Sequence, residues 1–197
     1  IYSTIGVLSH GLLDACTSYG TSLLWPVSDI RISWNIISII DPVFTSIIIT
    51  FFFLCIFSKS TKFMKIGLTL SFSYLFLCFV QYHQIKSFVL SNSKDRGHKI
   101  ERILLNPTIG NNILWRTIYQ YDGYYFIDGV YKPIFSKAKI INGTKIKVIN
   151  KENIYPELDQ NSKQREDIRR FSYFSQDYIF LHPDFDDVIA DLRYGTL

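Results

Sequence analysis

Three long apolar runs fill the first part of the chain. They cover residues 1–25, 36–57 and 66–80, and the last one extends toward Ile85. Each run approaches or exceeds the about 20 residues with which a helix crosses the hydrocarbon core of a bilayer. A buried helix of a soluble protein could resemble any one of them, but three in succession, with a short loop of lysines between two, favour membrane helices. The pattern therefore predicts about three transmembrane helices.

From Lys86 onward the pattern is that of a soluble, β-rich region. Residues 86–105 are typical of a short amphipathic helix that leads off the membrane, and residues 161–170 of a charged surface helix or loop. Asp122-Gly123 is a strong signal for a two-residue hairpin turn, and Asn142-Gly143 suggests a second tight turn. The runs of β-branched and aromatic residues that predict strands are 114–121, 124–130, 145–149, 171–180 and 188–194.

The distribution of charge supports the same division. Residues 1–85 hold four of the 21 Lys and Arg and three of the 17 Asp and Glu, and all the others lie beyond. We therefore expect a transmembrane helical region at 1–85 and a soluble extramembrane domain, mainly β, at 86–197. The predicted fold class is an α+β membrane protein with a small, mainly antiparallel β domain.

Loop lysines indicate how such a multi-pass protein is oriented. Lys59, Lys62 and Lys65 occupy the loop between the second and third apolar runs, and short loops rich in Lys and Arg face the cytoplasm. This places the carboxy-terminal domain on the extracytoplasmic side. Trp25 and Trp34 stand where aromatic residues anchor membrane helices at the interface.

His10 and Asp14 are the first candidates for chemistry. They are four residues apart, so on a helix both side chains project from one face. Imidazole and carboxylate are ligands for zinc, iron or manganese. In a soluble protein, a hydrogen bond from His10 to a neighbouring helix and local capping by Asp14 would explain the pair better. In a membrane segment an ionisable residue usually has a functional partner, and this favours a metal site.

Asp41 is the third candidate, as a further metal ligand or as the base for a metal-bound water. It precedes Pro42, and Asp before a proline at the start of a helix is also a common capping arrangement. Both interpretations stay open on the sequence alone. Nearby, Asp29 and Arg31 are expected to form a solvated pair at the membrane surface.

Other function classes fit the sequence poorly. The formal net charge of +4 is spread along the chain rather than clustered, so nucleic-acid binding is not expected. Cys16, Cys55 and Cys78 are far apart in apolar sequence and form no CxxC pair, which indicates buried free thiols. The sequence contains no GxSxG elbow, glycine-rich phosphate loop or HExxH motif.

The stretch HGLLDACTSYGTSLLWPVSDIRISWNIISIIDPVFT, residues 10–45, resembles the central motif of the YdjM-like bacterial inner-membrane metal-dependent hydrolases. That motif has His, three apolar residues and Asp, then T-x-YG, P-x-S-x-x-R, and D-P followed by a hydroxyl residue. The run NPTIGNNILWRTIYQYDGYYFIDGVY, residues 106–131, resembles the extramembrane domain of the same family. The positions that match the first motif are His10, Asp14, Thr17, Tyr19, Gly20, Pro26, Ser28, Arg31, Asp41, Pro42 and Thr45.

The resemblance implies a hydrolase of the bacterial inner membrane that uses a divalent metal ion, zinc or manganese. His10 and Asp14 would bind the metal, and Asp41 would be a third ligand or the base for a metal-activated water. The location of the pair in a membrane segment, rather than the resemblance, suggests a lipid or another membrane-associated substrate. Family members carry further His and Asp ahead of this block. The chain begins Ile1-Tyr2 without Met, so we expect a preceding portion to hold those ligands.

A non-catalytic membrane protein is the rival expectation. In that case His10, Asp14 and Asp41 hold helices together, and the aromatic strands at 119–131 bind a protein partner or an envelope component. The lipid bilayer is a partner under both expectations.

Overall fold

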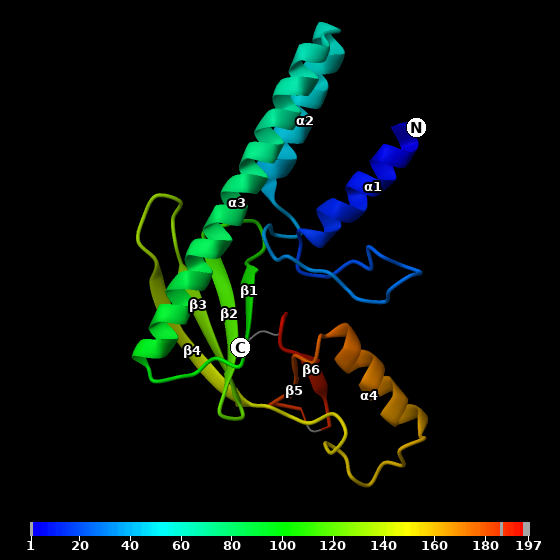
Figure 1. Cartoon of the computed structure of the whole chain (residues 1–197), viewed down its shortest axis with the longest axis vertical. Helices are drawn as coiled ribbons and strands as arrows, with labels where there is room; N and C mark the ends of the chain where they lie inside the picture. The colour runs from blue at the N-terminus through cyan, green and yellow to red at the C-terminus, as the bar shows by residue number, and fades with distance from the viewer. Residues whose placement is uncertain (1, 186, 195–197) are drawn as a thin grey trace.

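The fold joins three amino-terminal helices to a small antiparallel sheet (Figure 1). The computed structural model describes residues 2–185 and 187–194. Its architecture confirms the α+β class and the antiparallel sheet predicted from the sequence. The elements are α1 (Tyr2–Ala15), α2 (Pro42–Ser58), α3 (Thr61–Asp95), β1 (Arg102–Pro107), β2 (Leu114–Tyr121), β3 (Tyr124–Tyr131), β4 (Lys139–Lys147), α4 (Lys163–Phe174), β5 (Ile179–Leu181) and β6 (Ile189–Asp191).

Helices α2 and α3 form a closely packed antiparallel hairpin. Pro42 occupies the first position of α2, where its missing N–H group leaves no helical hydrogen bond unmade. The helices approach closely at Gly67, because a Cβ atom there would lie only 2.5 Å from Cβ of Phe51. At the tip, Lys59 adopts a left-handed conformation with φ of 49°, which ends α2. Lys59 is therefore at the tip of this hairpin, whereas Lys62 and Lys65, which were expected in the same loop, belong to the first turns of α3.

The helices differ in their capacity to cross a membrane. Among the described helices, α3 alone is both long and apolar enough, and its 35 residues extend about 52 Å. Helix α2 is a shorter apolar helix of 17 residues. The helix expected over residues 1–25 is wrong in extent, because α1 has 14 residues and ends at Ala15. The structure thus supports one clear candidate span and one shorter apolar helix rather than three spans.

The early end of α1 has a local cause. The hydroxyl of Thr17 donates a hydrogen bond to the carbonyl of Asp14 at 2.7 Å, and such a bond competes with helical pairing. Gly20 then has a φ of +79°, which turns the chain away from the helix axis. Residues 16–41 consequently form a loop at the base of the hairpin.

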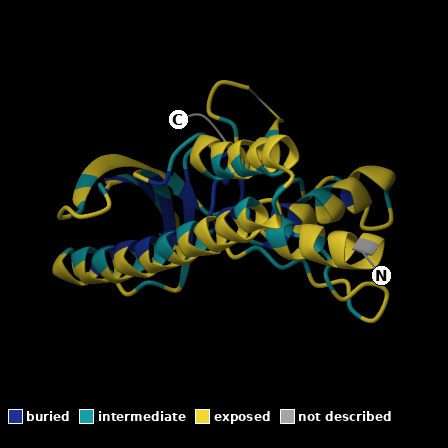
Figure 2. Ribbon diagram, turned by 90° about the horizontal axis from the view of Figure 1, so that it is seen from above, coloured by how far each residue is buried: buried dark blue, intermediate teal, exposed yellow. Residues whose placement is uncertain are grey.

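One face of α3 is buried along most of its length. Gly67 faces α2, whereas Ile85 and Val89 pack on the sheet beside Trp115. Because one continuous helix makes both contacts, it holds the hairpin and the sheet as a unit. Figure 2 shows buried residues (dark blue) along this helix beside the sheet. The buried residues of α3 are separated by three, four or seven positions, which places them on one face, and are Gly67, Ser71, Cys78, Gln81, Ile85, Val89 and Ser93.

The four-stranded sheet has the order β1-β2-β3-β4, with all neighbours antiparallel. Asp122 and Gly123 both have positive φ, 50° and 73°, as the favoured two-residue hairpin turn requires. The predicted hairpin is confirmed, and β2 has the predicted bounds.

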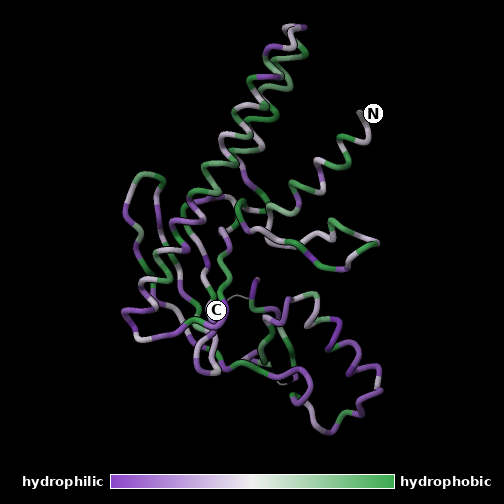
Figure 3. Tube along the Cα trace, in the orientation of Figure 1, coloured by the Kyte–Doolittle hydropathy of each residue, from purple (hydrophilic) through white to green (hydrophobic). Residues whose placement is uncertain are grey.

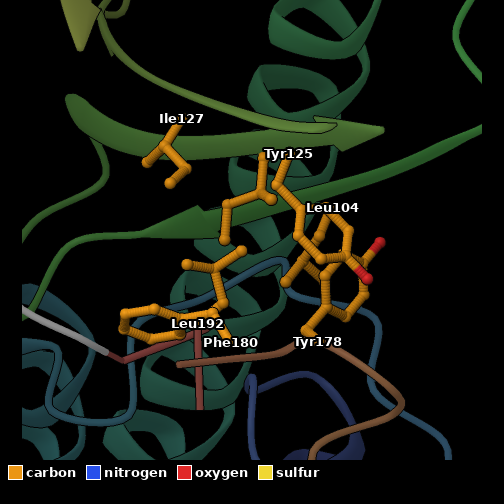
Figure 4. Close-up of a cluster of buried hydrophobic side chains, with 7 residues drawn as sticks. Leu104, Tyr125, Ile127, Tyr178, Phe180 and Leu192 are labelled. Atoms are coloured by element: carbon orange, nitrogen blue, oxygen red, sulfur yellow. The ribbon is translucent and has the colours of Figure 1, made fainter. Parts of the chain in front are cut away.

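Each face of the sheet carries its own core. Tyr119 and Val130 lie on the face that α3 covers, with Leu105 and Trp115. On the other face, Leu104 and Tyr125 pack against residues from the carboxy-terminal β5–β6 hairpin (Figure 4), and Ile118 belongs to the same cluster. Strand residues alternate between the two faces, so both layers depend on the same strands. The second cluster consists of Leu104, Ile118, Tyr125, Ile127, Tyr178, Phe180 and Leu192.

Two predictions for the carboxy-terminal half are wrong. Asn142-Gly143 lies inside β4, where the pairing with β3 shifts register between Ile127 and Gly129, so it forms a bulge rather than a turn. Residues 171–174 belong to α4 rather than to a strand, and β5 begins at Ile179. The strands β5 and β6 form a separate two-stranded sheet.

The helix expected over residues 86–105 is the end of α3, which continues to Asp95 before β1 begins. The proposed division at Ile85 therefore falls within a continuous helix. The division into a helical region at 1–85 and a β domain at 86–197 stays a prediction.

Candidate functional site

His10 and Asp14 contact each other on α1. His10 Nε2 lies 3.5 Å from Asp14 Oδ2, and the two side chains are 75% and 50% exposed. Their spacing places them one helical turn apart on one face, as the sequence predicts. The pair is open to its surroundings rather than enclosed in helix packing.

Asp41 is buried, and both of its carboxylate oxygens accept hydrogen bonds. Oδ1 accepts from the backbone N–H of Phe44 at 2.9 Å, which caps α2. Oδ2 accepts from the hydroxyl of Tyr74 on α3 at 2.8 Å. With the residue only 4% exposed, this geometry favours the capping interpretation over that of a general base.

A cavity of about 230 Å³ lies between the end of α1 and the start of α2. Thr17 and Asp41 are among its lining residues, whereas His10 and Asp14 are not. Within residues 2–185 and 187–194, no three or more His, Cys, Asp or Glu side chains gather as a metal site would require. The structure therefore brings together two of the three predicted site residues.

Other residues of the amino-terminal motif pack against α4. Arg31 Nη2 donates hydrogen bonds to the carbonyls of Tyr19 and Gly20, at 3.0 and 2.8 Å. Its guanidinium carbon lies 4.9 Å from the ring centre of Phe174, within the range of a cation–π contact. Arg31 is thus half-buried between the loop and α4, and not in the solvated pair with Asp29 that was expected.

The same loop holds the end of the described chain. The hydroxyl of Tyr194 donates to the carbonyl of Ser18 at 2.8 Å, and the rings of Tyr19 and Tyr194 are 5.3 Å apart. Gln176 donates to the hydroxyl of Ser33 at 3.2 Å. The loop at 16–41 therefore also contacts the carboxy-terminal residues that follow α4.

A polar junction connects α3 to the sheet. Gln81 Nε2 donates to the carbonyls of Asn112 and Lys132, at 3.2 and 2.6 Å, and Gln81 Oε1 accepts from Lys132 Nζ at 3.1 Å. Asn112 Nδ2 in turn donates to the carbonyl of Ile36 at 3.3 Å. Gln81 is absent from the predicted site residues. Its signal in the sequence is a single amide at the end of an apolar run.

The loop at the base of the hairpin, the capped start of α2 and the apolar part of the hairpin all lie within the first 85 residues. This segment can be compared with known families. Residues 1–85 match the model of the YdjM inner membrane protein family. The YdjM match confirms the resemblance that the motif indicates, and it supports a location in an inner membrane. It ends at Ile85, so the resemblance of residues 106–131 stays a prediction.

Two further comparisons add nothing to the YdjM match. No curated protein matches the chain, and no solved structure matches it.

The rival expectation assigned partner binding to the aromatic strands, and the structure shows where their rings lie. Tyr119 and Tyr125 are 1% and 2% exposed and belong to the two cores. Tyr124 and Tyr131 are the exposed tyrosines of β3. Most of this aromatic content therefore stabilises the sheet rather than forming a binding surface.

Proposed function

We propose that this chain is an integral membrane protein in which the α2–α3 hairpin lies in the bilayer. The observation that carries the proposal is the exposure of large apolar side chains along both helices. Figure 3 shows that hydrophobic residues recur along the hairpin. No residue of α2 is buried. An exposed apolar surface of this extent is unfavourable in water and favourable in lipid.

The length of α3 supports this arrangement. About 20 residues suffice for a crossing, so roughly 15 of its 35 residues extend beyond the bilayer. Those residues include Ile85 and Val89, which pack on the sheet. The sheet is therefore held outside the membrane on a helix that is anchored within it.

The orientation follows from the lysines at the hairpin tip. Lys59, Lys62 and Lys65 are on the cytoplasmic side by the positive-inside rule, and the sheet is extracytoplasmic. Helix α1 lies beside the hairpin, with its amino-terminal end toward the same side as the tip (Figure 1), and in this proposal it forms a third membrane-embedded helix.

Cysteine labelling tests the orientation. In a variant in which Cys16, Cys55 and Cys78 are replaced by Ser, single Lys59→Cys and Lys137→Cys substitutions place thiols at the hairpin tip and in the loop between β3 and β4. A membrane-impermeant maleimide applied to intact spheroplasts is expected to label Lys137→Cys and to reach Lys59→Cys only after lysis. The reverse pattern contradicts the orientation, and equal labelling of both sites before lysis contradicts the membrane crossing.

We propose further that the protein is a metal-dependent hydrolase. The observation in favour is the contact between His10 Nε2 and Asp14 Oδ2 at 3.5 Å on an exposed helix face. Two ligands about 2.1 Å from a tetrahedral zinc ion lie about 3.4 Å apart, so these atoms fit adjacent coordination positions without rearrangement.

The chemistry of such a site is that of a Lewis acid. A zinc or manganese ion held by His10 and Asp14 would lower the pKa of a bound water and polarise the oxygen of the bond to be cleaved. The exposure of the pair on a membrane helix suggests a lipid or another membrane-associated substrate. Asp41 as the catalytic base stays a prediction, since its oxygens are already engaged by Phe44 and Tyr74.

Metal content tests this second proposal. The purified full chain in detergent is compared with a His10→Ala, Asp14→Ala double variant, using metal analysis after exposure to zinc or manganese and removal of the free ion. Loss of about one bound ion per chain is expected in the double variant. The control is Asp29→Ala, which removes an exposed acid of the neighbouring loop and is expected to retain the metal.

Equal metal content in the wild type and in the double variant would eliminate the metal site. The non-catalytic membrane protein would then be the better account, with its extramembrane domain binding a partner or an envelope component.

A further inference from the structure

A second cavity, of about 460 Å³, opens between the base loop and α3. It lies at the level of Gln81, where α3 passes from the hairpin to the sheet. Tryptophan and tyrosine favour this depth in a membrane protein, because they combine an apolar ring with a polar group. The lining residues are Ser33, Trp34, Ile36, Phe79, Tyr82 and His83.

An exposed aromatic stripe leads from the hairpin into this cavity. Phe72, Phe76, Phe79 and His83 follow one another at intervals of four, three and four residues, which places them on one face of α3. The phenylalanines are 68%, 67% and 44% exposed, and the helix buries its opposite face against α2. In a bilayer this stripe lies against lipid acyl chains as far as the cavity.

The cavity also has polar lining groups, and a basic residue that does not line it follows one turn further along α3. His83 is exposed, and its ring lies 4.4 Å from that of Phe79. Lys86 is three positions further along α3 and lies, by helical geometry, in the arc between Tyr82 and His83. Ser33 adds a hydroxyl on the loop side. An apolar track therefore leads to the hydrogen-bonding groups of Ser33 and His83, and Lys86 follows on the next turn of α3.

We infer that this cavity binds the headgroup of an anionic phospholipid, whose acyl chains run along the stripe of Phe72, Phe76 and Phe79. The ammonium of Lys86 and the ring nitrogens of His83 contact the phosphate. Trp34 and Tyr82 pack on the glycerol region. The bound lipid ties the base loop to α3 at the membrane surface.

The site is distinct from the proposed metal site. His10 and Asp14 do not line the cavity. The inference concerns binding of a lipid and not its hydrolysis. Failure of the metal-binding test therefore leaves this inference untouched, and failure of lipid binding leaves the hydrolase proposal untouched.

Photolabelling tests the inference. The full chain is reconstituted in phosphatidylcholine vesicles that contain a trace of phosphatidylglycerol or phosphatidylcholine carrying a diazirine close to the glycerol. After irradiation, labelled peptides are identified by mass spectrometry, and labelling at residues 33–36 and 79–83 is divided by labelling on α2. The phosphatidylglycerol probe is expected to label the cavity preferentially.

Lys86→Gln is the informative variant. Removal of one lysine near an anionic headgroup is expected to lower this normalised labelling about fivefold. Lys163→Gln makes the same change of charge at an exposed position on α4 and should have no effect. Division by the α2 signal prevents poor insertion of a variant from imitating a loss of binding. Equal cavity labelling by the two probes, or unchanged labelling in Lys86→Gln, overturns the inference.

Discussion

The hydroxyl of Tyr74 donates a hydrogen bond to Asp41 at 2.8 Å, which joins the middle of α3 to the first turn of α2. Asp41 also caps α2 through the N–H of Phe44. One buried carboxylate thus serves two helices of the hairpin, and it lies within the residues that match the YdjM family.

Substitutions at this pair should separate the cap from the hydrogen bond between helices. Asp41→Ala is expected to destabilise the protein by about 2 kcal/mol, since it removes a cap worth about 1 kcal/mol and a hydrogen bond of similar value. Asp41→Asn keeps a good capping residue and should lose less. Thermal unfolding in detergent, monitored by circular dichroism, ranks the wild type and the two variants by stability. A catalytic role for Asp41 would show instead as an Asp41→Asn variant that is fully stable but inactive in hydrolysis.

Gly67 should tolerate no side chain, because a Cβ atom would approach Cβ of Phe51 to 2.5 Å. Gly67→Ala is expected to force α2 and α3 apart and to lower the midpoint of thermal unfolding, despite the higher helix propensity of alanine. Gly6→Ala on α1 is the matched control, because no neighbouring atom lies within 4 Å of its added Cβ. Equal midpoints for the two variants would show that the close approach of the helices does not contribute to stability.

The junction at Gln81 should be sensitive to loss of its amide. Gln81→Leu leaves Lys132 Nζ and the carbonyl of Lys132 without their partner, at a cost of about 1–3 kcal/mol for buried polar groups, whereas the carbonyl of Asn112 still accepts from Trp115 Nε1. Faster hydrogen exchange is expected in the loop that contains Asn112. Gln84→Leu makes the same change at an exposed position of α3 and should leave exchange in that loop unchanged.

Lys132 should make stability depend on pH. Burial lowers the pKa of Lys132 from its ordinary value of 10.5. The unfolded chain therefore binds more protons than the folded protein between the lowered pKa and 10.5, so stability rises with pH in that window. Lys132→Met should remove this rise, whereas Lys137→Met, at an exposed lysine, should retain it. Unfolding midpoints at several pH values from 8 to 10.5 measure the difference.

Features that depend on neighbours in the chain were predictable. The turn at Asp122-Gly123 is confirmed because its two residues favour the positive φ angles that the turn needs. The start of α2 at Pro42 follows from the fixed φ and missing N–H of proline. The contact between His10 and Asp14 follows from their spacing on a helix.

Features that depend on distant segments were not predictable from the sequence. Asn142-Gly143 has the composition of a turn but lies in β4, because pairing with β3 absorbs it in a bulge. Residues 171–174 have the composition of a strand but continue α4, which is held by the buried Arg165. Its guanidinium donates hydrogen bonds to carbonyls of the preceding loop, those of Lys151, Tyr155 and Leu158.

The sequence by itself determined the apolar hairpin with its lysine tip, the β-rich region beyond it and the pairing of His10 with Asp14. These properties arise from composition and from spacings of a few residues, which act through local backbone geometry and the free energy of transfer to lipid. Only the tertiary structure decided that Asp41 binds Tyr74, that Gln81 joins α3 to the sheet, and that Arg31 packs on α4. Each of these depends on segments distant in the chain, which no local pattern brings together.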